Sequence, residues 1–401
     1  MGVLSRHRLA AFVVLVLVAV GAVALAIQTA GNGSGGDAPS LPEGGSSFGG
    51  STAAGTASPE PAPATVEASG SGSGSVKPPA GQERQLAQLF LVGFRGRSTD
   101  DAFFARLAKR RWGAVIVDGS NYRDNAQLIT LTEKLNAVLR DAGAPAPLIA
   151  AQQGGGSQST LPGLPPAAQP TIGSLAEARA EATRASGKLR RLGIRMVLAP
   201  SADVGYSGGA GNGRAFSEDP DAVVRRASGA IAGWRTGGVA PAVGHFPGEG
   251  AASQDPAEGP ASVGLAPEQL QGADLKVFDA LLGTVPALVL SNALYVAYDA
   301  VTPATLLPEI PAIARRSGFK GMIVSGNLAA TVLASGGPIA DAAVAALKAG
   351  SDLLWIPGDA RDQEAAYRAV VRAVRSGEIS QTRVRDALAR VKTLKRKYAG
   401  G

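Results

Sequence analysis

The sequence predicts an α/β fold, a TIM-type (β/α)8 barrel formed by a single domain. Eight short apolar runs follow residue 82, and each but the last is followed by sequence with a helix-like spacing of apolar residues. The runs are apolar almost throughout, as parallel strands covered by helices are, and their number favours a closed barrel. We expect the strands at residues 89–94, 113–117, 147–151, 195–200, 240–244, 287–291, 321–325 and 352–357.

A doubly wound sheet is the alternative arrangement of such strands and helices. Nucleotide-binding folds of that kind carry a glycine-rich phosphate loop after the first strand, and this chain has none there. A cluster similar to GxGxxG, at Gly209, Gly211 and Gly213, lies in the middle of the chain, and no convincing helix start follows it. We interpret this cluster as a loop.

The N-terminus has the pattern of a membrane segment. An unbroken apolar or glycine run extends from Leu9 to Ile27 and follows the basic stretch 6–8. Its length is close to the roughly 20 residues that span a bilayer, and the preceding basic residues place the N-terminus in the cytoplasm. We therefore expect residues 1–30 to be a membrane anchor and the barrel to lie on the extracytoplasmic side. Small residues such as Ala24 and Ala30 leave cleavage and secretion as the alternative.

The segment from residue 31 to 82 is predicted to be a disordered linker. It consists mostly of Gly, Ser, Ala, Pro and Thr, which cannot bury enough apolar surface to offset the entropy lost on ordering. The barrel domain is expected at residues 83–399. The implied organisation is a folded domain tethered outside the membrane.

Composition and charge exclude several function classes. The chain has no cysteine and two histidines, so we expect no disulfide, no metal site and no cofactor. The net charge of +7 is concentrated near the C-terminus, where six apolar residues recur at three- and four-residue spacing, which predicts an amphipathic helix with a solvated basic face. No basic patch with interleaved aromatic residues accompanies this charge, so we expect no nucleic-acid partner. The six residues are Ile379, Val384, Leu388, Val391, Leu394 and Tyr398.

In a parallel barrel, catalytic groups follow the C-terminal ends of the strands. The chain offers few acids and bases at these places, and His245, at the end of the fifth run, is the only histidine after His7. The polar and glycine residues at the strand ends are Asp118, Ser120, Gln152, Gln153, Asp203, Gly244, His245, Asn292, Gly326, Asn327 and Asp359.

Several strings, taken together and in order, resemble one known family. They are GAVIVDGSNYRDNAQLITLTEKLN, LAPSADV, RAFSEDP, HFPGEG, VTPATLLPEI and ALKAGSDLLWIPGD. They resemble the N-terminal barrel domain of glycoside hydrolase family 3, in its β-N-acetylhexosaminidase branch, over nearly all of residues 84–398. The resemblance implies a retaining mechanism, with an aspartate nucleophile and an aspartate and histidine pair as acid and base.

The resemblance fails at the positions of the reacting groups. VSGNLAA matches the family's nucleophile segment and places Gly326 where the aspartate is expected, with Asn327 beside it. HFPGEGAASQDPA matches the acid and base segment, in which Asp255 keeps the aspartate and Ala257 stands where the histidine is expected. A glycine cannot act as a nucleophile, and a carboxylate without its imidazole partner loses the proton relay.

The sequence also lacks several of the residues that the resemblance implies for sugar binding. In AQQGGGSQS, Ala151 and Ser159 replace an aspartate and an arginine, and Gly244 replaces a lysine. Arg214 and His245 are the remnants of the polar set that the resemblance implies.

Four residues remain candidates for substrate binding: Arg214, His245, Asp203 and Asp255. His245 is interpreted either as a sugar hydroxyl contact or as a structural residue that holds the FPG turn. For Arg214 we favour an ion pair with Glu218 or Asp219 on its own loop over ligand contact. Asp203 is expected to be structural, at the start of a turn.

Other carboxylates offer no complete catalytic pair. Glu249 and Glu258 lie close to the lost acid and base, but neither supplies a nucleophile on the Gly326 side. An inverting reaction would have to recruit Asp118 or Asp203. A serine hydrolase is not indicated, because no GxSxG motif is present.

The sequence thus favours an exported, membrane-tethered pseudoenzyme with a structural, scaffolding or glycan-binding role at the cell envelope. Its expected partner is a cell-wall glycan or an envelope protein. The alternative is an active β-N-acetylhexosaminidase-type glycosidase with a rearranged site.

Overall fold

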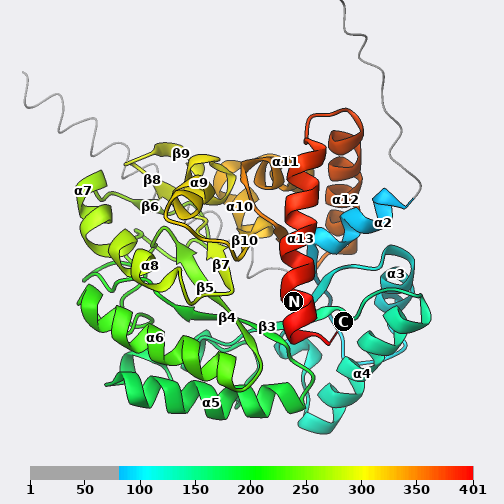
Figure 1. Ribbon diagram of the computed structural model, residues 1–401, viewed down its shortest axis with the longest axis horizontal. Helices are drawn as coiled ribbons and strands as arrows, with labels where there is room; N and C mark the ends of the chain where they lie inside the picture. Colours follow the sequence, from blue (N-terminus) through cyan, green and yellow to red (C-terminus); the bar gives the residue numbers. More distant parts are fainter. Residues whose placement is uncertain (1–80, 401) are drawn as a thin grey trace, which may run out of the picture. The chain divides into compact units, whose positions relative to one another are not determined.

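The computed structural model describes residues 81–400, and these form a closed barrel of eight parallel strands surrounded by helices (Figure 1). The predicted anchor and most of the predicted linker lie outside the described residues. Around the barrel the strand order is β1, β11, β10, β7, β5, β4, β3, β2. Their bounds are β1 Phe90–Gly93, β2 Ala114–Val117, β3 Leu148–Gln152, β4 Met196–Ser201, β5 Ala240–Phe246, β7 Ala287–Leu290, β10 Met322–Asn327 and β11 Leu353–Ile356.

Each of the eight predicted strands is a barrel strand, within one to two residues at either end. Closure between β1 and β11 excludes the doubly wound alternative, because Phe90 pairs with Leu354 and the sheet has no free edge. A second, three-stranded sheet was not predicted. It contains β6 (Ser262–Val263), β8 (Leu294–Tyr295) and β9 (Asp299–Pro303). The first two have only two residues each, too few for a periodic signal, and β9, DAVTP, is not an apolar run.

Helices follow every barrel strand, including the last, which the sequence pattern had left without one. Six of the twelve helices in the described part of the chain begin at a Ser or Asp side chain that accepts a hydrogen bond from a backbone N–H of the first turn, as Asp124 and Ser174 do. The helices are α2 Gln82–Leu86, α3 Ala102–Arg110, α4 Asn125–Asp141, α5 Leu175–Arg191, α6 Pro220–Thr236, α7 Pro267–Leu270, α8 Lys276–Leu281, α9 Glu309–Arg316, α10 Leu328–Ser335, α11 Ile339–Ala349, α12 Ala360–Arg375 and α13 Gln381–Tyr398.

The C-terminal helix α13 confirms the predicted amphipathic helix. Val384, Val391, Leu394 and Tyr398 are buried. The helix contacts β10 as well as α2 and the 3-10 helix Ala87–Leu89, both of which precede β1, and it lies in front of the barrel as seen in Figure 1. It therefore lies at the end of the barrel where the strands begin. The described part therefore starts and ends at this end of the barrel. We call it the lower face, and α13 marks it in Figure 1.

One buried carboxylate fastens α13 to the barrel. Asp352, directly before β11, is fully buried and receives Arg383 and Arg390 from α13 and Arg315 from α9. Because buried charges are tolerated only when paired and hydrogen-bonded, this group of four side chains should fix the position of α13.

Among residues 81–400, no single helix is long and apolar enough to cross a membrane. One bent pair, α10 and α11, meets the length and composition criteria together, with an angle of 105° between its members. Buried residues on both helices pack into the hydrophobic core of the barrel domain.

Candidate functional site

The C-terminal ends of the strands hold a buried cluster of charged side chains around Asp203. This residue follows β4 and is fully buried. Its Oδ1 accepts hydrogen bonds from the backbone N–H groups of His245 (3.1 Å) and Glu249 (3.0 Å). Its Oδ2 lies 2.9 Å from His245 Nδ1. These contacts show that Asp203 holds the loop after β5.

Glu249 occupies the centre of the same cluster. Its Oε1 accepts from Arg214 Nη2 at 2.9 Å and lies 3.1 Å from His245 Nδ1, and its Oε2 accepts from Ser291 Oγ at 2.8 Å. The side chain is 5% exposed. Three side-chain contacts leave the Glu249 carboxylate little freedom to move toward a ligand.

Arg214 does not form the ion pair predicted from its own loop. It pairs with Glu249 and, through Nη1, with Asp255 Oδ2 at 3.1 Å, both of which come from the loop after β5. The predicted ion pair of Arg214 with Glu218 or Asp219 was wrong, because proximity in sequence does not determine the direction in which the Arg214 side chain points. Arg214 points into the barrel mouth, where the β5 loop folds over it.

These contacts shift the pKa values of the cluster in different directions. Burial lowers the pKa of His245, but the Glu249 and Asp203 carboxylates outweigh burial and raise it to about 9. Burial would raise the pKa of Asp203, yet His245, Arg214 and the N–H of Glu249 hold it well below its usual range. Burial raises the pKa of Glu249, and the nearby Asp203 carboxylate adds to this effect. At neutral pH, His245 is thus a cation enclosed between carboxylates.

The same cluster fits a metal ion poorly. Asp203, His245 and Glu249 offer ligand atoms within 4.8 Å of one another. Metal binding requires a neutral imidazole, whereas His245 Nδ1 is hydrogen-bonded to a carboxylate and the ring is protonated at neutral pH. The Arg214 guanidinium on Glu249 adds a further positive charge.

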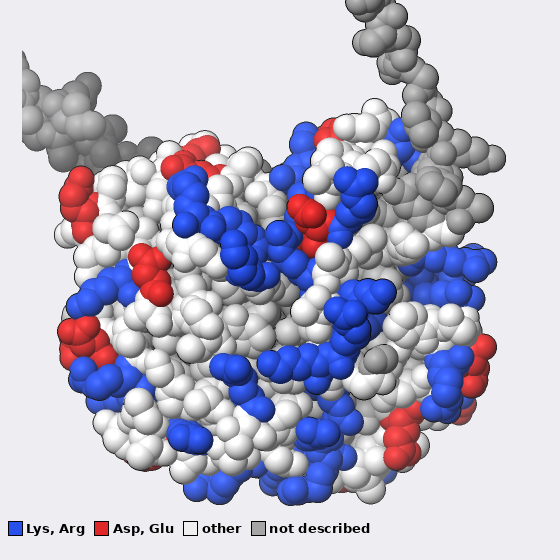
Figure 2. Space-filling view, viewed as in Figure 1, with Lys and Arg blue, Asp and Glu red and all other residues white. Residues whose placement is uncertain are grey.

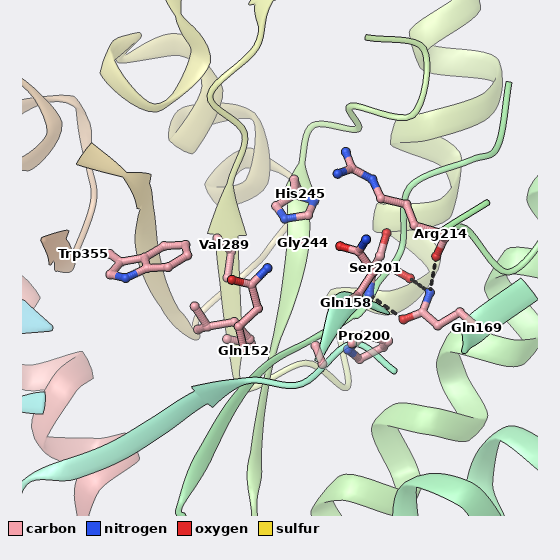
Figure 3. Close-up of a pocket in the computed structure, with 14 residues that line it drawn as sticks. Gln152, Gln158, Gln169, Pro200, Ser201, Arg214, Gly244, His245, Val289 and Trp355 are labelled. Carbon is pink, nitrogen blue, oxygen red and sulfur yellow. Dashed lines mark hydrogen bonds between the residues drawn. The ribbon is translucent and has the colours of Figure 1, made fainter. Parts of the chain in front are cut away.

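A small cavity opens at the barrel mouth beside this cluster (Figure 3). Its volume is about 40 Å³. Figure 3 shows Trp355 and Val289 on one side of it and Arg214 and Gln169 on the other, with His245 above. Among the described residues, those that line the cavity include neither Asp203 nor Glu249. The cavity therefore presents carboxamide, hydroxyl, cationic and apolar side chains but no carboxylate of the described residues.

Two donors at this cavity have no hydrogen-bond partner among the described residues: Arg214 Nε and Trp355 Nε1. Gln169 is fully engaged, because its Nε2 donates to the carbonyl groups of Ser201 and Arg214 and its Oε1 accepts from the N–H of Ser201. Arg214 Nε and Trp355 Nε1 are thus buried and unsatisfied within the described part of the chain.

The strand-end position at Gly326 is filled by a neighbouring side chain. A Cβ atom on Gly326 would lie 2.6 Å from Asn292 Cγ and closer still to Asn292 Oδ1. Asn292 is fixed there, since its Nδ2 donates to the carbonyl of Asn327 (3.0 Å) and its Oδ1 accepts from Thr331 Oγ1 (2.8 Å). No side chain can extend from position 326 unless Asn292 moves.

The remaining candidates have local structural contacts. Asp255 is 39% exposed, and its Oδ1 accepts from the N–H of Ala257. Asp118 and Asp359 cap the short 3-10 helix at residues 119–121 and helix α12. Asn327 caps α10. Of the four predicted substrate-binding residues, Arg214 and His245 line the cavity, whereas Asp203 and Asp255 do not. Asp203 contacts the His245 ring and Asp255 pairs with Arg214.

Comparison with known proteins identifies the family. Residues 82–394 match the model of the glycosyl hydrolase family 3 N terminal domain. The chain belongs to glycosyl hydrolase family 3. It is 30% identical over 283 residues to a beta-hexosaminidase of Alkalilimnicola ehrlichii, which covers 66% of this chain and 79% of that protein. A beta-hexosaminidase of Vibrio cholerae is 30% identical over 257 residues, covering 61% of this chain and 74% of its own.

Solved structures of family 3 share the fold. A beta-N-acetylglucosaminidase from Paenibacillus sp. superposes with a TM-score of 0.74 at 28% identity, over 79% of this chain. The match spans 62% of that longer protein. A beta-N-acetylhexosaminidase from Beutenbergia cavernae gives a TM-score of 0.71 at 26% identity, over 78% of this chain and 98% of its own. The resemblance stated from the sequence motifs is thereby confirmed.

Sequence reasoning missed the central place of Glu249 and the role of Asn292. Glu249 was weighed only as a replacement acid, although its position between Gly248 and Gly250 of the β5 loop was visible. Asn292 was noted only as a strand-end residue, because nothing in its own segment indicates that it reaches the end of the neighbouring strand β10.

Proposed function

We propose that this chain is a family 3 barrel that does not hydrolyse glycosidic bonds and that serves a structural or scaffolding role at the cell envelope. One observation carries the proposal: the carboxamide of Asn292 occupies the space into which a side chain at Gly326 would extend. The resemblance assigns the nucleophile to this position. Substitution to glycine and filling of the vacated space together remove the covalent step of a retaining reaction.

The other carboxylates do not rebuild the reaction. Asp203 and Glu249 are held in ion pairs with His245 and Arg214 beside the cavity, and Asp118 is a helix cap. An inverting reaction needs a base that activates water and an acid on the opposite side of the bond. Among the described residues, no carboxylate lines the cavity.

The size of the cavity favours scaffolding over sugar binding. Small-molecule sites usually enclose about 300–1,000 Å³. A volume of about 40 Å³ accommodates ordered water rather than a hexosamine ring. The named relatives are beta-hexosaminidases, which supports a glycan as the partner. An envelope protein is the alternative partner.

Export and tethering are part of the proposal. The run from Leu9 to Ile27 follows basic residues and is long enough to span a bilayer, which supports an anchor with the barrel on the extracytoplasmic side. Secretion after cleavage is the alternative. Mass spectrometry of the protein extracted from membranes distinguishes the two, because a cleaved chain lacks the peptides before residue 31.

Two assays on the purified domain (residues 82–401) test the role of the barrel. We expect no release of chromophore from a chromogenic N-acetylglucosaminide. Turnover that Glu249→Gln abolishes and Glu258→Gln leaves intact would contradict the proposal. We also expect no heat of binding when chitooligosaccharides are titrated to millimolar concentration; saturable heat that Arg214→Lys removes would instead support a glycan-binding role.

A further inference from the structure

The lower face of the barrel collects positive charge from many helices. Barrel helices run antiparallel to the strands, so their C-terminal turns gather at this face. Cations are favoured there because the last turn of a helix carries partial negative charge. Twelve basic residues lie in the last turns of seven helices: Lys109, Arg110, Arg140, Lys188, Arg190, Arg191, Arg235, Arg315, Arg316, Lys348, Arg372 and Arg375.

Helix α13 adds Lys395, Arg396 and Lys397 at its own end. Figure 2, viewed with α13 in front, shows far more Lys and Arg than Asp and Glu on this side. Several acids of this face are already neutralised. Asp352 is surrounded by three arginines, and Glu378 pairs with Lys348. Five of the twelve basic residues are themselves in ion pairs with acids, so the charge available to a partner is that of the other seven together with the end of α13.

An apolar groove lies within this basic surface. Its volume is about 610 Å³, and it is formed by α13 together with Gln85, Gln88 and Pro145. Leu388 and Val391 line it, and Arg385, Lys392 and Arg396 contribute to its walls with exposed side chains. A hollow with apolar lining and cationic sides matches a molecule that has an anionic head and an apolar chain.

Lys395 provides an independent indication. Its side chain is 95% buried beside the groove, and its Nζ donates to Gln88 Oε1 at 2.7 Å. Among the described residues, no carboxylate forms an ion pair with it, and burial lowers its pKa to about 8. A buried ammonium without a counter-charge is costly, and an anion in the groove would compensate it.

We propose that the lower face is a docking surface for an anionic phospholipid bilayer, in which the cations of α13 contact lipid phosphates and the groove receives part of an acyl chain. The apolar groove favours a bilayer over a soluble polyanion, since a polyanion needs only the charges. Residues 1–80, which contain the run Leu9–Ile27, join the barrel at α2 on this same face. The inference rests on the proposed function for export and tethering but is independent of the proposed loss of hydrolysis.

Vesicle flotation of the domain (residues 82–401), which lacks the predicted anchor, tests the surface itself. This part contains the whole closed barrel and its core, and the match with the Beutenbergia cavernae protein covers 98% of that chain. We expect binding to vesicles of phosphatidylcholine mixed with phosphatidylglycerol, no binding to phosphatidylcholine alone, and weakening by salt.

Charge reversal locates the surface. Lys392→Glu with Arg396→Glu should lower the partition coefficient by about tenfold or more. The matched control is Arg95→Glu with Arg97→Glu, an equal change of charge on exposed side chains after β1 at the opposite end, and should alter the coefficient by less than about twofold. Unchanged melting temperatures confirm that both variants fold. Equal loss in both variants would overturn the proposal, because it would show attraction by net charge alone.

A groove variant and a soluble competitor complete the test. Leu388→Glu places an acid in the apolar lining and should reduce vesicle binding further than an acid at the exposed position Lys397 does. Binding of the domain to heparin without any binding to vesicles would overturn the proposal in favour of a polyanionic partner. Hydrolysis is measured separately on the same variants. A failure of vesicle binding therefore does not contradict the proposed loss of hydrolysis, and hydrolysis would not contradict vesicle binding.

Discussion

The side chain of Asn292, at the end of β7, fills the space beside Gly326, at the end of β10. The two positions are neighbours around the barrel, since β7 pairs with β10. A glycine at position 326 and a carboxamide at position 292 therefore depend on each other. This dependence can be measured.

We predict that Gly326→Ala destabilises the domain by about 1–3 kcal/mol, because the new methyl group overpacks against Asn292. Gly283→Ala is the matched control, since a Cβ at that exposed position meets nothing within 4 Å, and it should change stability by less than about 0.5 kcal/mol. Urea denaturation measures both. In the double variant Asn292→Ala with Gly326→Ala the glycine effect should shrink. Additive effects would show that Asn292 is not the obstacle.

The protonation of His245 is expected to be visible directly. The domain of residues 82–401 contains no other histidine, so its NMR spectrum has a single imidazole. We predict a titration midpoint near 9, because two carboxylates enclose the ring. A midpoint near the ordinary value of 6.5 would contradict the ion pairs with Asp203 and Glu249.

The same shift makes stability depend on pH. A histidine whose pKa is raised on folding stabilises the native state fully below about pH 6.5, and this contribution disappears as pH rises toward 9. This shift in the pKa of His245 corresponds to a contribution of at most about 3 kcal/mol to the free energy of unfolding. The free energy of unfolding should decrease across this interval. In His245→Gln the decrease should be absent, and an unchanged profile would refute the assignment.

Removal of the Arg214 guanidinium should lower the free energy of unfolding, because Glu249 then remains buried without its main cation. We predict that Arg214→Ala lowers stability by about 3–5 kcal/mol. Arg225→Ala removes a 62% exposed guanidinium that lies 3.8 Å from Asp219, and it should cost less than about 1 kcal/mol. Thermal denaturation compares the two. Equal effects would mean that the cluster at the barrel mouth contributes nothing specific.

Asp352 should be essential for the attachment of α13. Asp352→Asn leaves three arginines facing a neutral amide, and we predict a loss of about 3 kcal/mol together with faster hydrogen exchange in α13. Asp386→Asn, on an exposed position of the same helix, is the control. If exchange in α13 does not change, the helix is held by apolar packing alone.

The barrel could be predicted because its signal is local. Each of the eight strands is a short apolar run bounded by turns or helices, and the periodicity of α13 showed in its own residues. The three-stranded sheet was not predicted because two-residue strands such as β6 have no period. The fold thus follows from patterns within segments.

The site could be predicted only in part because it depends on contacts between segments. Gly326 and Ala257 were found by resemblance, and His245 and Arg214 do line the cavity. The partners of Arg214 come from a loop that is 35 and 41 residues away in sequence, so no local pattern indicates them. The same reason applies to Asn292 and Thr331, which are 39 residues apart.

Hydrolysis measured under the most permissive conditions is the sharpest test of the proposed function. Chitotriose is incubated for days with a molar excess of the domain, and its products are followed by mass spectrometry. We predict that the substrate remains intact at the rate of the blank. Release of N-acetylglucosamine by the wild-type domain, lost in Glu249→Gln and retained in Glu258→Gln, would show that a working acid survives and would contradict the proposal.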